Sequence, residues 1–153
     1  MTTCSPQRTR GAEVDENELT EQIIGAAIEV HRALGPGLLE IVYEECLAIE
    51  LEVRGLKFQR QVPVPIGYKG HEIPANLRIV LLVEGRVIVE VKAVETLLPV
   101  HEAQLLTYLR LTDKRVGLLI NFNVPALRRG IKRMVNKFPD APAPRLSGGR
   151  FKE

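Results

Sequence analysis

The sequence predicts an α/β (α+β) fold in which a central mixed sheet is flanked by helices, in the order ααβββαβα. Three observations predict it: two helical patterns open the chain, two dense β-branched runs follow as a hairpin, and helical and strand patterns then alternate. Helices and a sheet bury their apolar faces against each other, so a layered domain follows. The 153 residues, 45% of them hydrophobic, suffice for one core.

Two helices are expected first, in residues 19–34 and 38–54. Apolar side chains recur at helical spacing in both, and Asn17 is the expected N-cap of the first. Gly35-Pro36-Gly37 ends the first helix, and Gly55 ends the second.

Three strands follow. Residues 58–66 alternate and contain prolines, which favours an edge strand. Residues 77–83 and 87–94 form a hairpin across residues 84–86. A three-residue loop there would set Val80 opposite Glu90 on the same face, whereas a two-residue loop would turn it away.

The rest of the domain alternates again. Pro99 opens a helix through Leu111, residues 115–122 form a short buried strand, and residues 127–138 form an amphipathic helix. The polar face of this last helix would carry Arg128, Arg129, Lys132 and Arg133. We expect a domain over residues 17–138, with flexible tails at 1–16 and 139–153.

Composition excludes several classes of protein. The longest apolar runs, such as residues 79–83, are too short to span a bilayer, and the start MTTCSPQRTRG lacks a signal-peptide core. Two cysteines without a CxxC pair favour a reducing compartment, so we expect a cytoplasmic protein without a membrane partner. Residues 13–52 are acidic and residues 110–137 basic; the basic segment would attract a polyanion or pair with its own chain's acidic segment.

The candidate chemistry lies in Glu90-Val91-Lys92, in a strand otherwise made of valine and isoleucine. Side chains two apart on a strand share a face, and charges on a buried face are costly unless they are paired or used. One interpretation is an ion pair or a solvent-facing side of the hairpin. The other is a metal site, with the carboxylate holding Mg²⁺ and the lysine stabilising charge or positioning water.

The segment GLLEIVY at residues 37–43 matches a GxxExxY signature, and the match extends through IVEVKAVE, HEAQLLTYLRL and GLLINF. The chain therefore resembles the bacterial GxxExxY proteins, which are similar to the RecB-like branch of the PD-(D/E)xK nuclease superfamily. The resemblance implies a restriction-endonuclease-like core and metal-dependent hydrolysis of DNA.

Carried over to this chain, the resemblance makes Glu90 and Lys92 the ExK pair and Glu40 a further helix carboxylate. Gln104 and Tyr108 match a QxxxY motif and are four apart on one helix, so both can face one site, with His101 a turn earlier. Each also has a structural interpretation: Tyr43 and Tyr108 as core aromatics, Gln104 as a cap and His101 as a first-turn polar residue.

One departure from the family pattern decides the expectation for catalysis. The family carries an aspartate, its principal metal ligand, where this chain has Val80. We favour the three-residue hairpin loop, because the family's metal site would need residue 80 opposite Glu90. Glu90 and Glu40 would remain as ligands for Mg²⁺ or Mn²⁺, so the cation would be bound weakly or lost. We expect an impaired DNA hydrolase. The alternatives are a catalytically inactive module that binds nucleic acid, RNA included, or protein, and a structural partner in an assembly. Arg128, Arg129, Lys132 and Arg133 are the expected contacts to a nucleic-acid backbone, although a solvated helix face is commoner.

Overall fold

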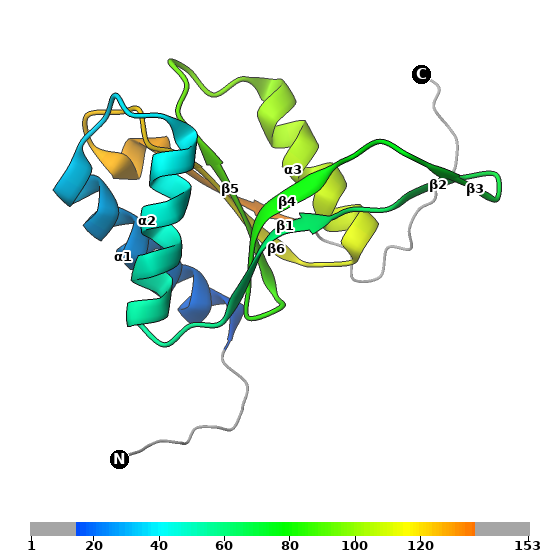
Figure 1. Ribbon diagram of the computed structural model, residues 1–153, viewed down its shortest axis with the longest axis horizontal. Helices are drawn as coiled ribbons and strands as arrows, with labels where there is room; N and C mark the ends of the chain where they lie inside the picture. The colour runs from blue at the N-terminus through cyan, green and yellow to red at the C-terminus, as the bar shows by residue number, and fades with distance from the viewer. Residues whose placement is uncertain (1–14, 137–153) are drawn as a thin grey trace, which may run out of the picture.

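The computed structural model describes residues 15–136, which begin with two helices on one face of a sheet (Figure 1). α1 spans Glu16–Leu34 and buries an apolar stripe of Leu19, Ile23, Ala26, Ala27 and Val30. The prediction of Asn17 as the N-cap is wrong. Asp15 holds that position, because its extended backbone lets the carboxylate accept the Asn17 N–H at 3.2 Å.

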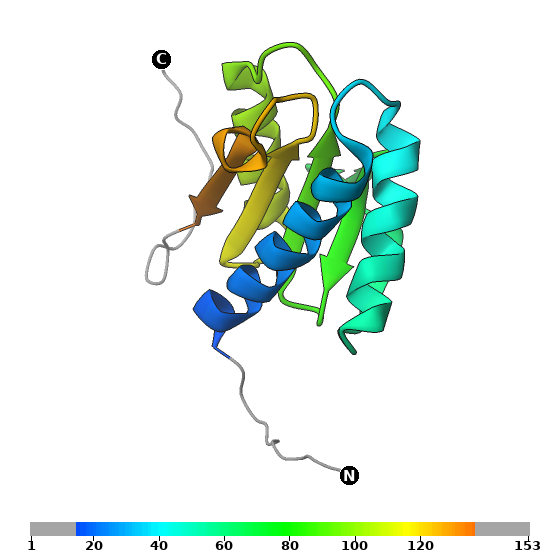
Figure 2. The same ribbon diagram turned by 90° about the vertical axis from the view of Figure 1, so that its left-hand side faces the viewer.

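α2 spans Glu40–Val53, within the range predicted for the second helix. Its inward-facing side chains are fully buried, namely Tyr43, Leu47 and Leu51. The chain leaves the helix direction at Gly55, where φ is +77°. α1 and α2 lie side by side over the same face of the sheet, with α1 crossing it diagonally (Figure 2).

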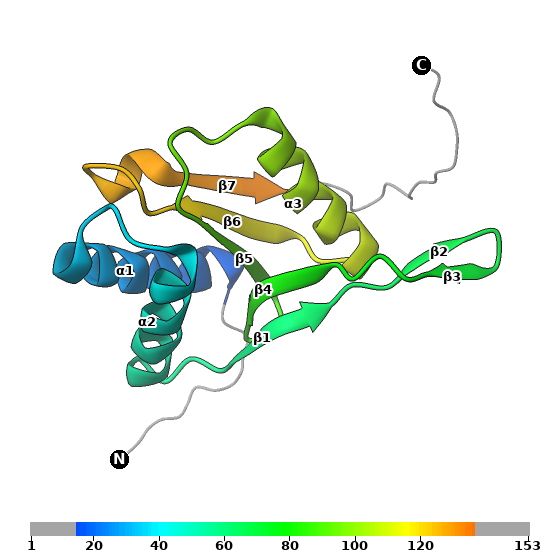
Figure 3. The same ribbon diagram turned by 45° about the horizontal axis from the view of Figure 1, so that its top comes forward.

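The central sheet has five strands in the order β1-β4-β5-β6-β7, with β5 and β6 parallel and the other neighbours antiparallel. α3, Pro99–Thr112, connects the parallel pair and covers the opposite face (Figure 3). The strands are β1 Phe58–Pro63, β4 Arg78–Val83, β5 Val87–Lys92, β6 Val116–Asn121 and β7 Ile131–Val135. The predicted mixed sheet flanked by helices is confirmed, and β1 is an edge strand as predicted.

The hairpin of β4 and β5 turns through residues 84–86, which confirms the three-residue loop. Leu81 pairs with Val89 and Val83 with Val87. The paired register of β4 and β5 ends at Leu81 and Val89. Val80, the next residue, packs against the core beneath α1 and α2, whereas Ile88, two residues before Glu90 on β5, packs on the α3 side of the sheet. The expectation that Val80 and Glu90 share a face therefore stays a prediction.

The helix predicted for residues 127–138 is wrong. The chain makes a 3-10 turn, η1, at Leu127–Gly130, and then the antiparallel strand β7. The apolar spacing of this segment fits a helix and a strand alike, and pairing with the open side of β6 decides for the strand. Gly130 passes so close to the Asn121 carbonyl oxygen that any Cβ there would overlap it. Phe138 lies outside the described residues.

A second, separate hairpin was not predicted. The segment after β1 continues as β2, Ile66–Tyr68, and returns as β3, His71–Ile73, so the strand predicted over 58–66 ends at Pro63. This hairpin projects from the body of the molecule (Figures 1 and 3). Of the tails predicted at 1–16 and 139–153, only Asp15 and Glu16 are described, and Glu16 already belongs to α1. No helix within residues 15–136 is long and apolar enough to cross a membrane.

Candidate active site

Glu90 lies near the end of β5, and its side chain is almost completely buried, with 4% exposed. The backbone N–H of Val80 donates to its carboxylate at 3.4 Å. Burial raises the pKa of Glu90 to about 7, against a lowering by the Val80 N–H and the Lys92 charge, and the charges of Glu40 and Glu44 raise it further. Near neutral pH this carboxyl group is therefore protonated in a large share of molecules.

Val80 contacts Glu90 through its backbone N–H, and its side chain is half-buried against the core beneath α1 and α2. Its contribution to the site is a backbone hydrogen-bond donor, since its side chain has no atom that can bind a cation. The resemblance places a carboxylate at this position. The structure therefore has one buried acid where the family pattern would bring two together.

Glu40 begins α2 and is exposed, and its Oε2 accepts the Ala93 N–H at 3.4 Å. Ala93 directly follows Lys92, so this contact ties the start of α2 to the end of β5. The charge of Glu40 is also close enough to raise the pKa of Glu90. Glu40 thus lies at the rim of the same site, with Glu90 beneath it.

The loop before α2 explains why Glu40 sits there. Gly37 has a φ of +100°, a conformation that favours glycine. The Tyr43 hydroxyl donates to the Gly35 carbonyl and accepts the Leu38 N–H at 3.1 Å. The Tyr43 ring stacks on Phe122 with centroids 4.6 Å apart. Tyr43 is therefore a core aromatic with a satisfied hydroxyl, and it braces the loop that presents Glu40.

Lys92 is half-buried and shares the strand face of Glu90. Its charge lowers the pKa of Glu90, yet no salt bridge within residues 15–136 joins the two side chains at contact distance. Glu90 is also not on a solvent-facing side of the hairpin, because it is buried. The two structural interpretations of this pair therefore do not describe it, and its ammonium group stands near the carboxyl without neutralising it by contact.

α3 supplies the remaining predicted residues. Tyr108 is buried, and burial together with the Glu90 charge raises the pKa of its hydroxyl, so the two side chains are neighbours. Gln104 lies one turn earlier and is exposed, and within residues 15–136 no hydrogen bond ties its side chain to the site. His101 accepts the Leu98 N–H at Nδ1 over 2.9 Å, which caps the start of α3. His101 therefore has the structural role that its first-turn position indicates.

Two groups beside the site were missed by the sequence interpretation. Glu44, one turn after Glu40, is buried and accepts hydrogen bonds from Arg60 at 3.0 Å and from Gln61 at 3.1 Å. Asn121, also buried, accepts the Val94 N–H at 3.0 Å and donates to the Val94 carbonyl at 2.9 Å, which fixes the segment after Lys92. Asn121 could have been found from the sequence, because it is a lone asparagine at the end of an otherwise apolar strand.

The basic residues expected on one helix face do not share a face. Arg128 and Arg129 are exposed in η1, whereas Lys132 and Arg133 alternate along β7. Lys132 pairs with Glu102 of α3 at 3.2 Å, and Arg133 donates to Asn17 of α1. The predicted common face is wrong because this segment is a strand.

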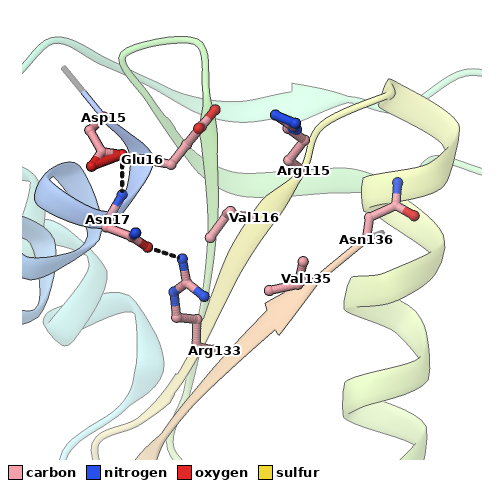
Figure 4. Close-up of a pocket in the computed structure, with 8 residues that line it drawn as sticks. All are labelled: Asp15, Glu16, Asn17, Arg115, Val116, Arg133, Val135 and Asn136. Carbon is pink, nitrogen blue, oxygen red and sulfur yellow. Dashed lines mark hydrogen bonds between the residues drawn. The ribbon is translucent and has the colours of Figure 1, made fainter. Parts of the chain in front are cut away.

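Arg133 borders a shallow pocket of about 270 Å³ at the start of β6, where Asn17 and Arg115 also face the opening (Figure 4). β5 and β6 run parallel, with Val87 beside Val116 at this end and Lys92 beside Asn121 at the other. The pocket therefore lies at the opposite end of β6 from Glu90 and Lys92, and it is no part of that site.

The residues present do not fit the metal site that the resemblance implies. No three His, Cys, Asp or Glu side chains within residues 15–136 are grouped so that they could hold a metal ion. The buried carboxyl of Glu90 already accepts the Val80 backbone N–H, and near-octahedral coordination of Mg²⁺ needs further oxygen ligands beside it. The second ligand position is filled by Val80.

Comparison with known proteins adds one finding. A family model described as the PD-(D/E)XK nuclease superfamily matches residues 17–134, well over half of the chain. The match includes Glu40, Val80, Glu90, Lys92, Gln104 and Tyr108. No curated protein and no solved structure matches the chain significantly.

Proposed function

Because the chain belongs to the PD-(D/E)XK nuclease superfamily, we propose that it is a nuclease-fold protein whose own metal-dependent hydrolysis of DNA is severely impaired. The observation that carries this proposal is the contact between Val80 and Glu90: the chain has a valine where the family pattern has an aspartate, and it meets the buried carboxyl of Glu90 with a backbone N–H alone. The superfamily implies a nucleic-acid substrate, and we take DNA as that substrate, with RNA as the alternative to test.

Impairment follows from the ligand chemistry. Mg²⁺ prefers near-octahedral oxygen coordination and is commonly held by one or two carboxylates together with substrate phosphates and waters. An aspartate at position 80 would bring a second carboxylate close to Glu90, because the backbone of residue 80 already contacts the Glu90 carboxyl. Valine removes that ligand, and the resulting apolar surroundings favour the protonated form of Glu90. Glu40 is too exposed to replace a buried ligand.

Support for the other site residues comes from their charges and burial around Glu90: the Lys92 charge lowers its pKa, and the Glu90 charge raises the pKa of the buried Tyr108. We propose that Lys92 supplies positive charge toward a phosphate and that Tyr108, with Gln104 above it, orients the bound strand. The GLLEIVY segment places the chain, on our proposal, among GxxExxY proteins of the RecB-like branch. Tyr43 and Gly37 of that signature act structurally, by holding the Glu40 loop against β5.

The test compares cleavage of single-stranded and double-stranded DNA, with RNA as a third substrate, in the presence of Mg²⁺ or Mn²⁺. The variants are Val80→Asp, Val80→Asn and the double variant Val80→Asp with Lys92→Ala. Asparagine matches aspartate in shape and lacks its charge, so it separates restored ligation from altered packing.

We expect cleavage to rise well above the unmodified chain only in Val80→Asp, and to fall again when Lys92 is also removed. Vigorous cleavage by the unmodified chain that Val80→Asp does not improve would contradict the proposal. Equal inertness of all variants, with each folded, would favour a non-catalytic role instead.

A further inference from the structure

α2 carries apolar residues on the side that faces away from the sheet as well as on the side that packs. Tyr43, Leu47 and Leu51 point into the core. On the outer side, Ile49 is 59% exposed and Val53 73% exposed. A helix that is apolar on both sides is typical of one that is covered on both sides. The α2 outer face, defined as Ile41, Glu45, Ile49, Glu52 and Val53, is left open by this chain.

The projecting hairpin of β2 and β3 is the second open feature. Its strands have three residues each and pair with each other in a separate two-stranded sheet. An isolated two-stranded hairpin is marginally stable in water. We call residues 66–73 the β2–β3 arm; within residues 15–136, the five-stranded sheet does not extend into it.

One face of the β2–β3 arm is apolar and exposed. Ile66 pairs with Ile73 and Tyr68 with His71, so these four side chains lie on the same face, whereas Glu72 lies on the other. Tyr68 is 63% exposed. The Lys69 ammonium lies 5.5 Å from the centroid of the Tyr68 ring, which adds a positive charge beside the apolar face.

These two surfaces both expose apolar side chains, and the charges beside them are of opposite sign. The α2 outer face offers aliphatic side chains flanked by Glu52, since Glu45 is already paired with Arg60 of β1. The arm offers aliphatic and aromatic side chains flanked by Lys69. Opposite charges around a matching apolar contact favour association and select the partner. Covering both surfaces would also supply the support that a free hairpin lacks.

The two surfaces lie at opposite ends of the long axis of the molecule (Figure 1). The arm therefore cannot fold back onto α2 of its own chain, whereas it can reach α2 of a neighbour. We propose that this protein self-associates through the β2–β3 arm of one copy docking on the α2 outer face of another. The contact is heterologous, since two different surfaces of the same chain meet in it.

The experiment uses sedimentation velocity of the full chain and three variants over the micromolar range. Ile49→Glu places a charge on the α2 outer face, and Tyr68→Glu places one on the arm. Leu111→Glu makes the same kind of change at an exposed position of α3 and is the matched control. Far-UV circular dichroism checks that each variant is folded.

We expect the unmodified chain and Leu111→Glu to associate, and Ile49→Glu and Tyr68→Glu each to sediment as monomers. An equimolar mixture of the last two should form one-to-one dimers, because the intact arm of one variant meets the intact α2 of the other. A monomeric unmodified chain would overturn the proposal. So would association of Tyr68→Glu on its own, since α2 would then dock on a surface other than the arm, or a mixture that stays monomeric.

Discussion

The burial of Glu90 makes a quantitative prediction about stability and pH. Its carboxyl has a pKa raised to about 7 in the folded chain, against an ordinary value of 4.5. An acid whose pKa is raised by folding stabilises the folded state fully at a pH below its unfolded pKa. That stabilisation is lost as the pH rises through its folded pKa. The difference of about 2.5 units corresponds to about 3 kcal/mol of the free energy of unfolding at alkaline pH.

The perturbation is Glu90→Gln, which keeps the size of the side chain and an oxygen that can accept the Val80 N–H. Glutamine carries no charge at any pH, so the variant should match the unmodified chain in stability below the unfolded pKa of 4.5 and gain on it as the pH rises from there. Above pH 8 the variant should be the more stable of the two, by up to about 3 kcal/mol.

The assay is urea unfolding at several pH values from about 4 to about 9, followed by far-UV circular dichroism because the chain has no tryptophan. Glu95→Gln, at an exposed position shortly after β5, is the matched control and should show no pH-dependent gain. A constant stability difference between Glu90→Gln and the unmodified chain at every pH would refute the reasoning that Glu90 is buried and protonated.

Three further predictions concern residues that hold the loops and strands around the site in place, and each can be checked by the same urea unfolding measurement. Tyr43→Phe keeps the stacked ring but removes the hydroxyl that braces the loop before α2, and should lower the free energy of unfolding by about 1 to 2 kcal/mol. A result within error of the unmodified chain would contradict this. Gly130→Ala forces a Cβ onto the Asn121 carbonyl and should lower the free energy of unfolding by about 3 kcal/mol or more. An unchanged free energy of unfolding would argue against the close backbone approach at Gly130. Glu44→Gln leaves Arg60 without its buried partner and should cost about 3 kcal/mol, whereas Glu45→Gln, at the exposed partner, should cost less than about 1 kcal/mol; equal costs would count against the buried pair.

The parts of the fold that the sequence predicts well are those with an unambiguous period. Alternation through the strands around the 84–86 turn predicts the hairpin, and the three-residue loop sets the register that pairs Leu81 with Val89 and Val83 with Val87. Helical spacing predicts α1, α2 and α3 within a few residues. In each case one local pattern and the tertiary packing favour the same structure.

The prediction for the segment after β6 fails because its local pattern and its tertiary packing favour different structures. Its apolar residues fit a helix by spacing, but the open edge of β6 and the close backbone approach at Gly130 select a strand. Nothing in the local pattern contains that information. The predicted basic helix face is wrong for the same reason, because Lys132 and Arg133 are successive residues of a strand and point to opposite sides of the sheet.

The candidate site divides in a similar way. Glu90 and Lys92 stand out because charges interrupt an apolar strand, and Glu40 stands out through the motif around it. The burial of Glu44 depends on Arg60 and Gln61 of β1, which only the folded chain brings near. The exposure of Gln104 likewise depends on how α3 is rotated over the sheet, and spacing alone does not fix that rotation.

Cation binding tests the central claim most directly. Calorimetric titration of Mn²⁺ into the unmodified chain and into Val80→Asp compares the two ligand sets in the same fold, and Val80→Asn controls for shape. We predict no measurable heat of site binding in the unmodified chain or in Val80→Asn, and stoichiometric binding in Val80→Asp. Tight, stoichiometric uptake by the unmodified chain would contradict the claim that Val80 has removed the metal site.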